Sequence, residues 1–166
     1  MEENQKIPMR SQVKKEDTWA IEDMYATVED WEKDFAAAKK VAEEAAEYAG
    51  RLGESAQALY DWSVLTEKLD CMLNEIYGYA SRVKDQDTAD AAGQTLSARA
   101  MGLYVECSGL ISFADPEILS IPEEKLEAFY AEKPELLKYR RSINEVRRCK
   151  DHILSPELEK ILADAG

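Results

Sequence analysis

The chain has 166 residues, of which 34 are acidic and 21 basic, so its net charge is −13 with the single histidine neutral. Its seven glycines and five prolines stand among abundant Ala, Glu, Leu and Lys, a composition typical of helices. An apolar content of 45% is enough to build a core, which excludes wholesale disorder. One histidine and three cysteines leave little from which to build a metal or nucleophile site, and this argues against a complete enzyme of the usual His-dependent kinds.

Charge and hydropathy exclude several further classes. A net charge of −13 repels phosphate backbones, so we expect no nucleic-acid partner. No apolar run approaches the ~20 residues of a membrane span, and the start lacks the apolar stretch of a secretory signal. The three cysteines are widely spaced without a CxxC pair, which fits reduced thiols in a cytoplasmic protein.

The first half of the chain predicts two elements after a polar arm. Residues 1–16 lack periodicity and are expected to form a flexible or extended arm. Residues 17–25 predict a short docked turn. Thr27, with Asp30 three residues later, predicts the cap of a helix that Gly50 would end. Apolar residues recur along that helix at helical spacing: Trp31, Phe35, Ala38, Val41, Ala42, Ala45 and Tyr48.

Two more long helices follow. Ser55 is expected to cap a helix that runs to about Val83, with a broad apolar stripe. Asp87 or Thr88 is expected to cap the next helix, whose stripe Arg99 interrupts. Asp115-Pro116 should end it, because the residue before a proline disfavours the helical conformation.

The remaining elements are shorter. Ser120 and Glu123 form a capping-box pattern that predicts a helix through Tyr130. Pro134 predicts the start of a helix that runs through Val146. No convincing strand pattern occurs, so the fold class is all-α: a helical bundle with two or three long antiparallel helices followed by shorter ones.

A last helix is expected to open at Ser155-Pro156 and to stop at Gly166 after barely two turns. It carries a good cap and a fresh apolar stripe. It could dock on the bundle or be the first element of a further region, and we favour the second.

The candidate chemical residues all have structural interpretations. A single His152 cannot supply a His-Glu-x-x-His pair, and a capping or neighbour-bonding role is favoured. Cys71 and Cys107 lie on long helices, where a buried free thiol acts as a small apolar group. Cys149 lies among basic residues that could lower its thiol pKa, yet packing is again favoured. The sequence therefore predicts no catalytic, cofactor-binding or metal-binding residue in this chain.

Two clusters have a functional and a structural interpretation. The basic residues could bind an anion or an acidic substrate, but pairing with the acidic first half of the chain is favoured: Arg140, Arg141, Arg147, Arg148 and Lys150. The aromatic residues could form a ligand box, but core or groove-edge positions are favoured: Trp31, Trp62, Tyr77 and Tyr79. Gly78 could permit a close helix crossing.

Several segments, in order, resemble the N-terminal region of the oligoendopeptidase F family, a group of thimet-oligopeptidase-like zinc peptidases. They cover nearly the whole chain and are Asp17-Thr18-Trp19-Ala20-Ile21-Glu22-Asp23-Met24-Tyr25, Trp31, Tyr48-Ala49-Gly50-Arg51-Leu52, Ile76-Tyr77-Gly78-Tyr79-Ala80, Asp85-Gln86-Asp87-Thr88 and His152-Ile153-Leu154-Ser155-Pro156-Glu157-Leu158-Glu159-Lys160-Ile161-Leu162-Ala163. Ala20 departs from the usual Asp of the family.

The resemblance implies a parent several times longer, in which residues 17–166 form an N-terminal helical domain and the catalytic domain is absent from this chain. It implies zinc, bound by a His-Glu-x-x-His motif in the missing part, and short peptide substrates in a channel. This region would form one wall of that channel and be inactive alone. Its partner would be the remainder of the polypeptide. The alternative is a stand-alone acidic helical adaptor or scaffold.

Overall fold

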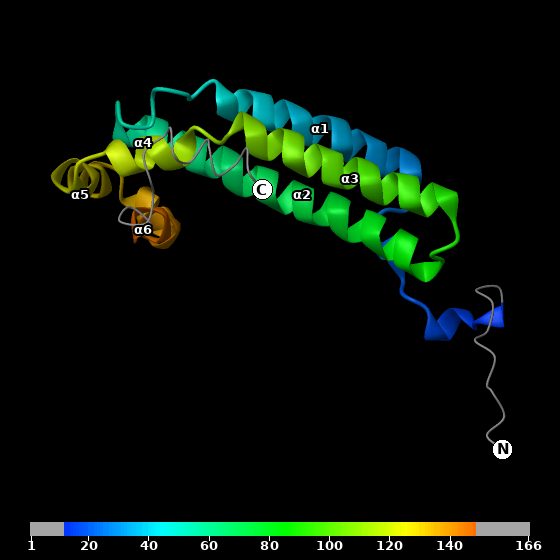
Figure 1. Ribbon diagram of the computed structural model, residues 1–166. Coiled ribbons are helices and arrows are strands. Elements are labelled where there is room, and N and C mark those ends of the chain that lie inside the picture. The colour runs from blue at the N-terminus through cyan, green and yellow to red at the C-terminus, as the bar shows by residue number, and fades with distance from the viewer. Residues whose placement is uncertain (1–11, 149–166) are drawn as a thin grey trace, which may run out of the picture. The chain divides into compact units, whose positions relative to one another are not determined.

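The computed structural model describes residues 12–148, and within that range every regular element is a helix, which confirms the all-α prediction (Figure 1). The expected arm up to residue 11 and the expected helix from Ser155 lie outside the described residues. The elements are η2 (Lys15–Asp17), η3 (Ile21–Asp23), α1 (Val28–Ala46), α2 (Ala56–Gln86), α3 (Ala91–Leu110), α4 (Ala114–Ser120), α5 (Glu123–Glu132), η4 (Pro134–Tyr139) and α6 (Arg140–Arg148).

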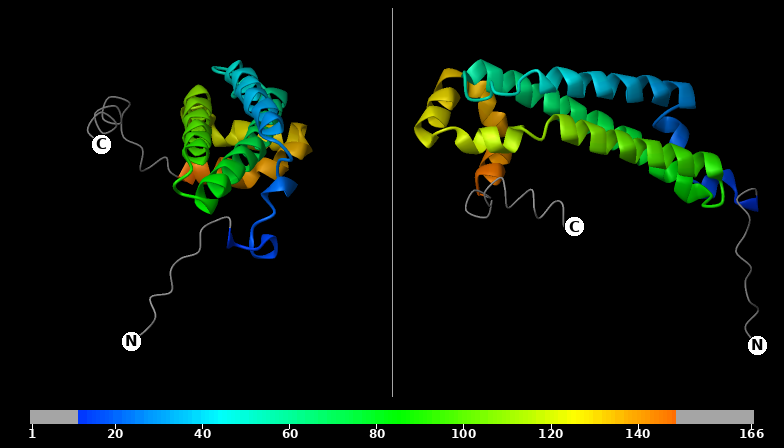
Figure 2. Two further views of the ribbon diagram at one scale, coloured as in Figure 1. Left: turned by 90° about the vertical axis from the view of Figure 1, so that its right-hand side faces the viewer. Right: turned by 45° about the horizontal axis from the view of Figure 1, so that its top comes forward.

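The helices divide between two compact units. The first contains the chain up to Glu43 together with Glu67–Gly109, and the second contains Glu44–Thr66 together with the chain from Leu110. The 31-residue α2 contributes to both. In the first unit α1, α2 and α3 lie side by side as antiparallel neighbours in all three views (Figures 1 and 2), as predicted.

The core of the first unit includes Trp31 of α1. Its side chain is fully buried, and its Nε1–H donates to the carbonyl oxygen of Ile76 at 3.0 Å, which joins α1 to α2. Apolar residues with the predicted helical spacing are buried with it: Ala38, Val41, Leu69, Leu73, Ala80, Leu96, Ala100, Leu103 and Cys107. Burial of this one stripe from each helix stabilises the unit.

A close approach of two helix backbones in this unit occurs at Gly93 and not at Gly78. A Cβ on Gly93 would lie 3.1 Å from the Cα of Lys84, so the glycine lets α3 lie against the end of α2. A Cβ on Gly78 would instead meet side chains, at 3.0 Å from Arg82 Nη1 and 3.3 Å from Met24 Cε. The prediction of a helix crossing at Gly78 was therefore wrong.

Two of the predicted caps are confirmed. Thr27 Oγ1 accepts from the Asp30 N–H at 3.1 Å, while its hydroxyl donates to Asp30 Oδ2 at 2.8 Å. Ser55 Oγ accepts from the Ala58 N–H at 3.1 Å. Each cap satisfies a backbone donor that has no partner within its own helix.

The predicted cap of α3 was wrong. Asp90 takes this role, since its carboxylate accepts from the N–H groups of Ala92 at 3.2 Å and Gly93 at 3.0 Å. Asp87 forms the preceding turn instead, by accepting from the Ala89 N–H at 3.0 Å. Three polar residues within four positions, Asp87, Thr88 and Asp90, could each cap a helix, and Asp90, the last of them, caps α3.

The end of α1 lies earlier than predicted. The α-helix stops at Ala46, and the chain continues in tighter turns whose amides bond three residues back. Gly50 then takes a positive φ of 80°, the conformation that favours glycine after a helix. Glu117 of α4 holds this turn, because its carboxylate accepts from the N–H groups of Gly50 and Leu52.

Pro116 and Ser120 were assigned to the wrong helix boundaries, whereas the predicted helix start at Pro134 is confirmed. α3 ends at Leu110, and Pro116 lies in the first turn of α4, where a missing N–H costs no hydrogen bond. Ser120 does not cap α5; Pro122 precedes that helix, and the Ser120 hydroxyl donates back to the carbonyl of Glu117 at 2.6 Å. The single helix expected from Pro134 is a 3-10 helix, η4, followed by α6.

The second unit has its own core, built from α4, α5, η4, α6 and the start of α2. Tyr60, Trp62 and Tyr139 pack against it from partly buried positions. Its buried members are Leu52, Ala56, Leu59, Ala114, Ile118, Ile121, Leu126, Phe129, Tyr130, Leu136 and Ile143.

Truncation of Trp31 should destabilise the protein far more than truncation of Trp19. Trp31→Ala removes a fully buried ring and its bond to Ile76, so we expect a loss of about 3–5 kcal/mol in the free energy of unfolding. Trp19 is 56% exposed, and Trp19→Ala should change it by less than about 0.5 kcal/mol. Urea unfolding followed by far-UV circular dichroism measures both, and equal losses would contradict this core.

Alanine at Asp90 and at Thr88 tests the reassigned cap. Asp90→Ala should cost about 1 kcal/mol of unfolding free energy, because it removes the acceptor for two backbone donors. Thr88 takes part through its backbone carbonyl, which accepts from Gln94 Nε2 at 2.6 Å, so Thr88→Ala should be nearly neutral. If Thr88→Ala lost more unfolding free energy than Asp90→Ala, Thr88 would be the cap, as the sequence predicted.

Candidate functional site

The cysteines and the histidine give no assembled reactive site among residues 12–148. His152, Cys149 and Lys150 lie outside the described residues. Cys71, expected to be a packing residue, is exposed on α2. Cys107 is buried in α3, and burial, followed by the charge of Glu106, raises the pKa of its thiol. A thiol held neutral in this way packs as an apolar group and is a poor nucleophile.

Arg147 is used as a structural cation. Its side chain is only 16% exposed, and its Nη1 donates to the carbonyl oxygens of Ile118 at 3.2 Å and Ile121 at 2.6 Å. Its Nη2 donates to Glu123 at 2.7 Å. Arg147 thus satisfies carbonyls at the end of α4, where a cation is favoured.

Arg140 and Arg148 are also paired. Arg140 donates to Glu127 at 2.8 Å and lies over the ring of Tyr130, 5.2 Å from its centroid. Arg148 donates to Glu145 on its own helix at 3.1 Å. The favoured interpretation of a paired basic helix therefore holds for these arginines and for Arg147. Their acidic partners, however, lie between residues 123 and 145 and not in the first half of the chain.

The four aromatic residues considered as a ligand box do not form one cluster. Trp31 is in the core of the first unit, and Tyr79 meets the edge of Tyr25 at a centroid distance of 5.2 Å. Trp62 packs against the core of the second unit. Tyr77 is 38% exposed. Packing accounts for the first three positions.

Arg99 forms a cross-helix contact that sequence reasoning missed. From α3 its Nη2 donates to Glu32 of α1 at 2.8 Å, and its guanidinium lies 5.2 Å from the ring centroid of Trp31 and 5.0 Å from that of Phe35. The hydrogen bond from Arg99 lowers the pKa of Glu32. The planar guanidinium therefore covers the aromatic core and holds a carboxylate at its edge.

The first segment of the resemblance, residues 17–25, is anchored by Tyr25. This ring is buried, and its hydroxyl donates to Asp34 Oδ2 at 3.0 Å. Burial, and then the hydrogen bond to Asp34, raise the pKa of Tyr25 well above its ordinary value. Together with the contact to Tyr79, this ties residues 21–25 to α1 and α2, in agreement with the expected docked turn.

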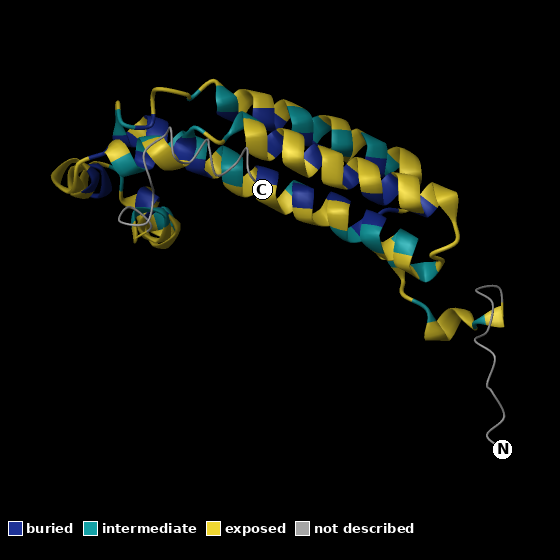
Figure 3. Cartoon of the chain, viewed as in Figure 1, coloured by how far each residue is buried: buried dark blue, intermediate teal, exposed yellow. Residues whose placement is uncertain are grey.

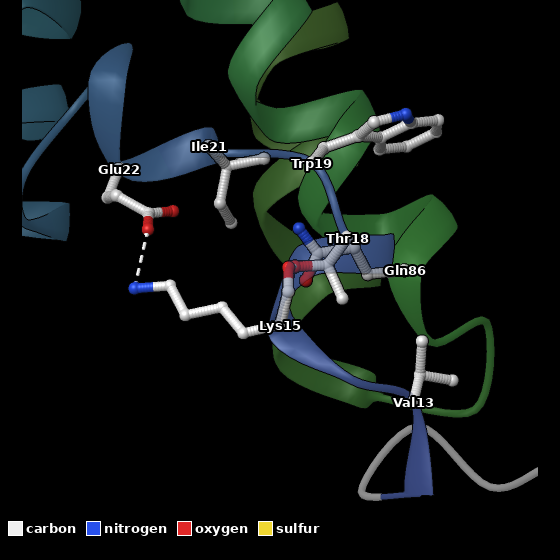
Figure 4. A pocket seen from close by; sticks show the side chains of 7 residues that line it. All are labelled: Val13, Lys15, Thr18, Trp19, Ile21, Glu22 and Gln86. Carbon is white, nitrogen blue, oxygen red and sulfur yellow. Dashed lines mark hydrogen bonds and ion pairs between the residues drawn. The ribbon is translucent and has the colours of Figure 1, made fainter.

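The same segment forms a surface hollow with the end of α2 (Figure 4). The hollow has a volume of about 410 Å³, and seven residues line it: Val13, Lys15, Thr18, Trp19, Ile21, Glu22 and Gln86. Lys15 and Glu22 point toward one another and form an ion pair at 3.1 Å, whereas the ring of Trp19 points away from that pair.

The lining of the hollow does not suit catalysis. It offers an ammonium, a carboxylate, a hydroxyl and an amide, but neither a thiol nor an imidazole. The Lys15 and Glu22 side chains are 89% and 48% exposed, so their pairing is weak in water. Bonding to its own backbone N–H, and then to Lys15, lowers the pKa of Glu22, so this carboxylate is not poised as a general acid near neutral pH.

The described residues also do not fit the zinc that the resemblance implies. Between residues 12 and 148 no group of three or more His, Cys, Asp or Glu side chains is arranged to hold a metal ion. That the whole chain lacks such a site stays a prediction.

Between residues 12 and 148, no helix has the length and the apolar content that a membrane crossing requires.

Comparison with known proteins gives consistent matches. The family model described as Oligopeptidase F matches residues 117–166. Oligopeptidase PepF of Bacillus subtilis (strain 168) is 39% identical over 160 residues, which are 96% of this chain but 24% of that protein.

Two solved structures share the fold. The crystal structure of oligoendopeptidase-F from Enterococcus faecium matches 83% of this chain and 26% of its own, with a TM-score of 0.72 and 28% identity. A peptidase structure from Chlamydophila abortus matches 96% of this chain and 27% of its own, with a TM-score of 0.81. At 24% identity the second match shows the fold alone.

The described residues thus form an all-helical region homologous to part of a peptidase. This chain is homologous to the N-terminal quarter of proteins of the oligopeptidase F family, and it spans about a quarter of the length of the relatives that it matches.

The buried hydroxyl of Tyr25 should make the stability of the protein fall at high pH. Because the folded state raises the pKa of Tyr25, the unfolded state loses that proton first, and stability falls as the pH rises past about 10. Tyr25→Phe should flatten this fall. Tyr77→Phe, at a partly exposed position of the same unit, should retain it. Urea midpoints at pH 8 to 11 measure the slopes, and identical slopes for all three proteins would contradict the assignment.

Proposed function

We propose that this chain is the N-terminal helical region of a zinc metalloendopeptidase that hydrolyses short peptides. The observation that carries the proposal is the match to the Bacillus subtilis oligopeptidase, which uses 96% of this chain and 24% of that protein. Three quarters of such a relative lie beyond the matched part. The catalytic and zinc-binding residues belong to that part, and the remainder of the polypeptide is the first partner of this chain.

The role of this region in the parent is to form one wall of the substrate channel. Packing and capping account for most of its distinctive residues: Trp31 is buried, Tyr25 docks, Gly50 turns the chain and Arg147 binds carbonyls. Such residues build a scaffold and leave the chemistry to another part of the protein. As one wall of the channel, this region would contribute to substrate access and size exclusion.

The remaining assignments follow from the same proposal. Residues 17–166 act as one N-terminal helical domain after an arm at 1–16. The parent acts on short peptides in the cytoplasm, without a nucleic-acid or membrane partner. The wide spacing of the three cysteines supports this location, and the net charge of −13 supports the absence of a nucleic-acid partner.

The purified 166-residue chain should bind no stoichiometric zinc and should not hydrolyse peptides. Metal analysis after dialysis and cleavage of fluorogenic short peptides measure the two properties, and the Bacillus subtilis oligopeptidase serves as the positive control. Cleavage by the pure chain that a chelator abolishes and zinc restores would contradict the proposal.

A further inference from the structure

The outer face of α3 is uncharged in a chain of which 33% of the residues are charged. Between Ala91 and Leu110 the two charged side chains are Arg99 and Glu106, and both reach α1, where they pair with Glu32 and Lys39. The opposite side of the helix carries six exposed residues spaced by three and four, which we name the outer stripe: Ala91, Gln94, Ala98, Met101, Val105 and Ser108.

The outer stripe exposes large apolar side chains. Met101 is 46% exposed and Val105 is 63% exposed, and Tyr104 beside them is 49% exposed. Figure 3 shows the side of α3 turned to the viewer as largely exposed. An added Cβ at Gly102 or Gly109 would meet nothing within 4 Å, so the surface there is open. A helix that is apolar on its outer side as well as its inner side is typically covered on both.

We propose that the outer stripe is the docking surface for a helix of the remaining polypeptide of the parent peptidase. The inference rests on the proposed function and names the surface through which this region is held. Residues spaced alternately by three and four form the seam of packed helices, and four of the six residues of the outer stripe are apolar. The small Ala91, Ala98 and Ser108 allow close approach. The docking helix would come from the part of the parent outside this region, because about three quarters of the length of the matched relatives lies outside the region that this chain matches.

A second copy of the chain is a poorer occupant. A 20-residue helix is ~30 Å long, so one face ~10 Å wide offers roughly 300 Å², whereas a standard interface buries about 800 Å² per partner. Two copies would also bring together chains that each carry a charge of −13. A segment of the same polypeptide is tethered, so it docks on a small surface without the entropy cost of association.

Substitution of Val105 in two settings tests the docking. The first setting is the 166-residue chain alone. The second is a chimera in which this chain replaces the matched quarter of the Bacillus subtilis oligopeptidase. Val105→Glu should leave the thermal midpoint of the isolated chain within about 2 °C, because the site is exposed. In the chimera it should lower the midpoint by roughly 5 °C or prevent folding, because the charge would be buried.

Two matched variants control the experiment. Val64→Glu introduces the same charge at a 39% exposed valine of α2 and should be harmless in both settings. Val105→Ala should fold in the chimera with a smaller loss. An unchanged chimera with Val105→Glu would overturn the proposal. So would an isolated chain that light scattering shows to be a dimer and that Val105→Glu converts to a monomer, because the second copy would then be the occupant.

The proposed function fails by a different result. If the unaltered chimera folds but does not cleave short peptides, the functional proposal is contradicted. The thermal midpoints of the chimeras would still show whether the outer stripe is a docking surface. A chimera that fails to fold with the unaltered chain counts against both, because this chain could then not replace the matched quarter.

Discussion

The placement of Trp31 between helices is the constraint on which the first unit depends. The ring is fully buried, bonds the backbone of α2 through Ile76 and is covered by Arg99 from α3. One side chain of α1 therefore contacts both other long helices. Glu32 completes the arrangement, because it holds the guanidinium that lies over the ring. The register of three antiparallel helices follows from these contacts, and so does the side of α3 that is left to face outward.

Several of the residues that resemble the oligopeptidase F family build the fold. Tyr25 anchors the segment before α1, Gly50 takes the positive φ that the turn requires, and Leu52 and Ile76 are fully buried. A likeness carried by such positions identifies a shared scaffold. It does not place chemistry on this chain, and the surface hollow beside Lys15 and Glu22 offers no set of groups suited to catalysis.

Local signals predicted much of this fold, and contacts between distant residues were missed. The three long helices and the cap at Thr27 were predictable, because spacing and capping act within a few residues. The cap at Asp90 was missed because Asp87 and Thr88 nearby are residue types that cap helices equally well. The position of Pro116 was predicted wrongly because a proline can follow the end of one helix or lie in the first turn of the next. Arg99 and Arg147 bind partners 67 and at least 24 residues away, so no local pattern could reveal that their charges are used structurally.

In the proposed function this chain supplies the scaffold of a peptidase, and the rest of the parent polypeptide supplies the chemistry. The most direct measurement is the rate at which the chimera with the Bacillus subtilis oligopeptidase cleaves a short fluorogenic peptide. We expect zinc-dependent cleavage by the chimera and none by the 166-residue chain alone. A folded chimera that shows no cleavage would contradict the proposed function.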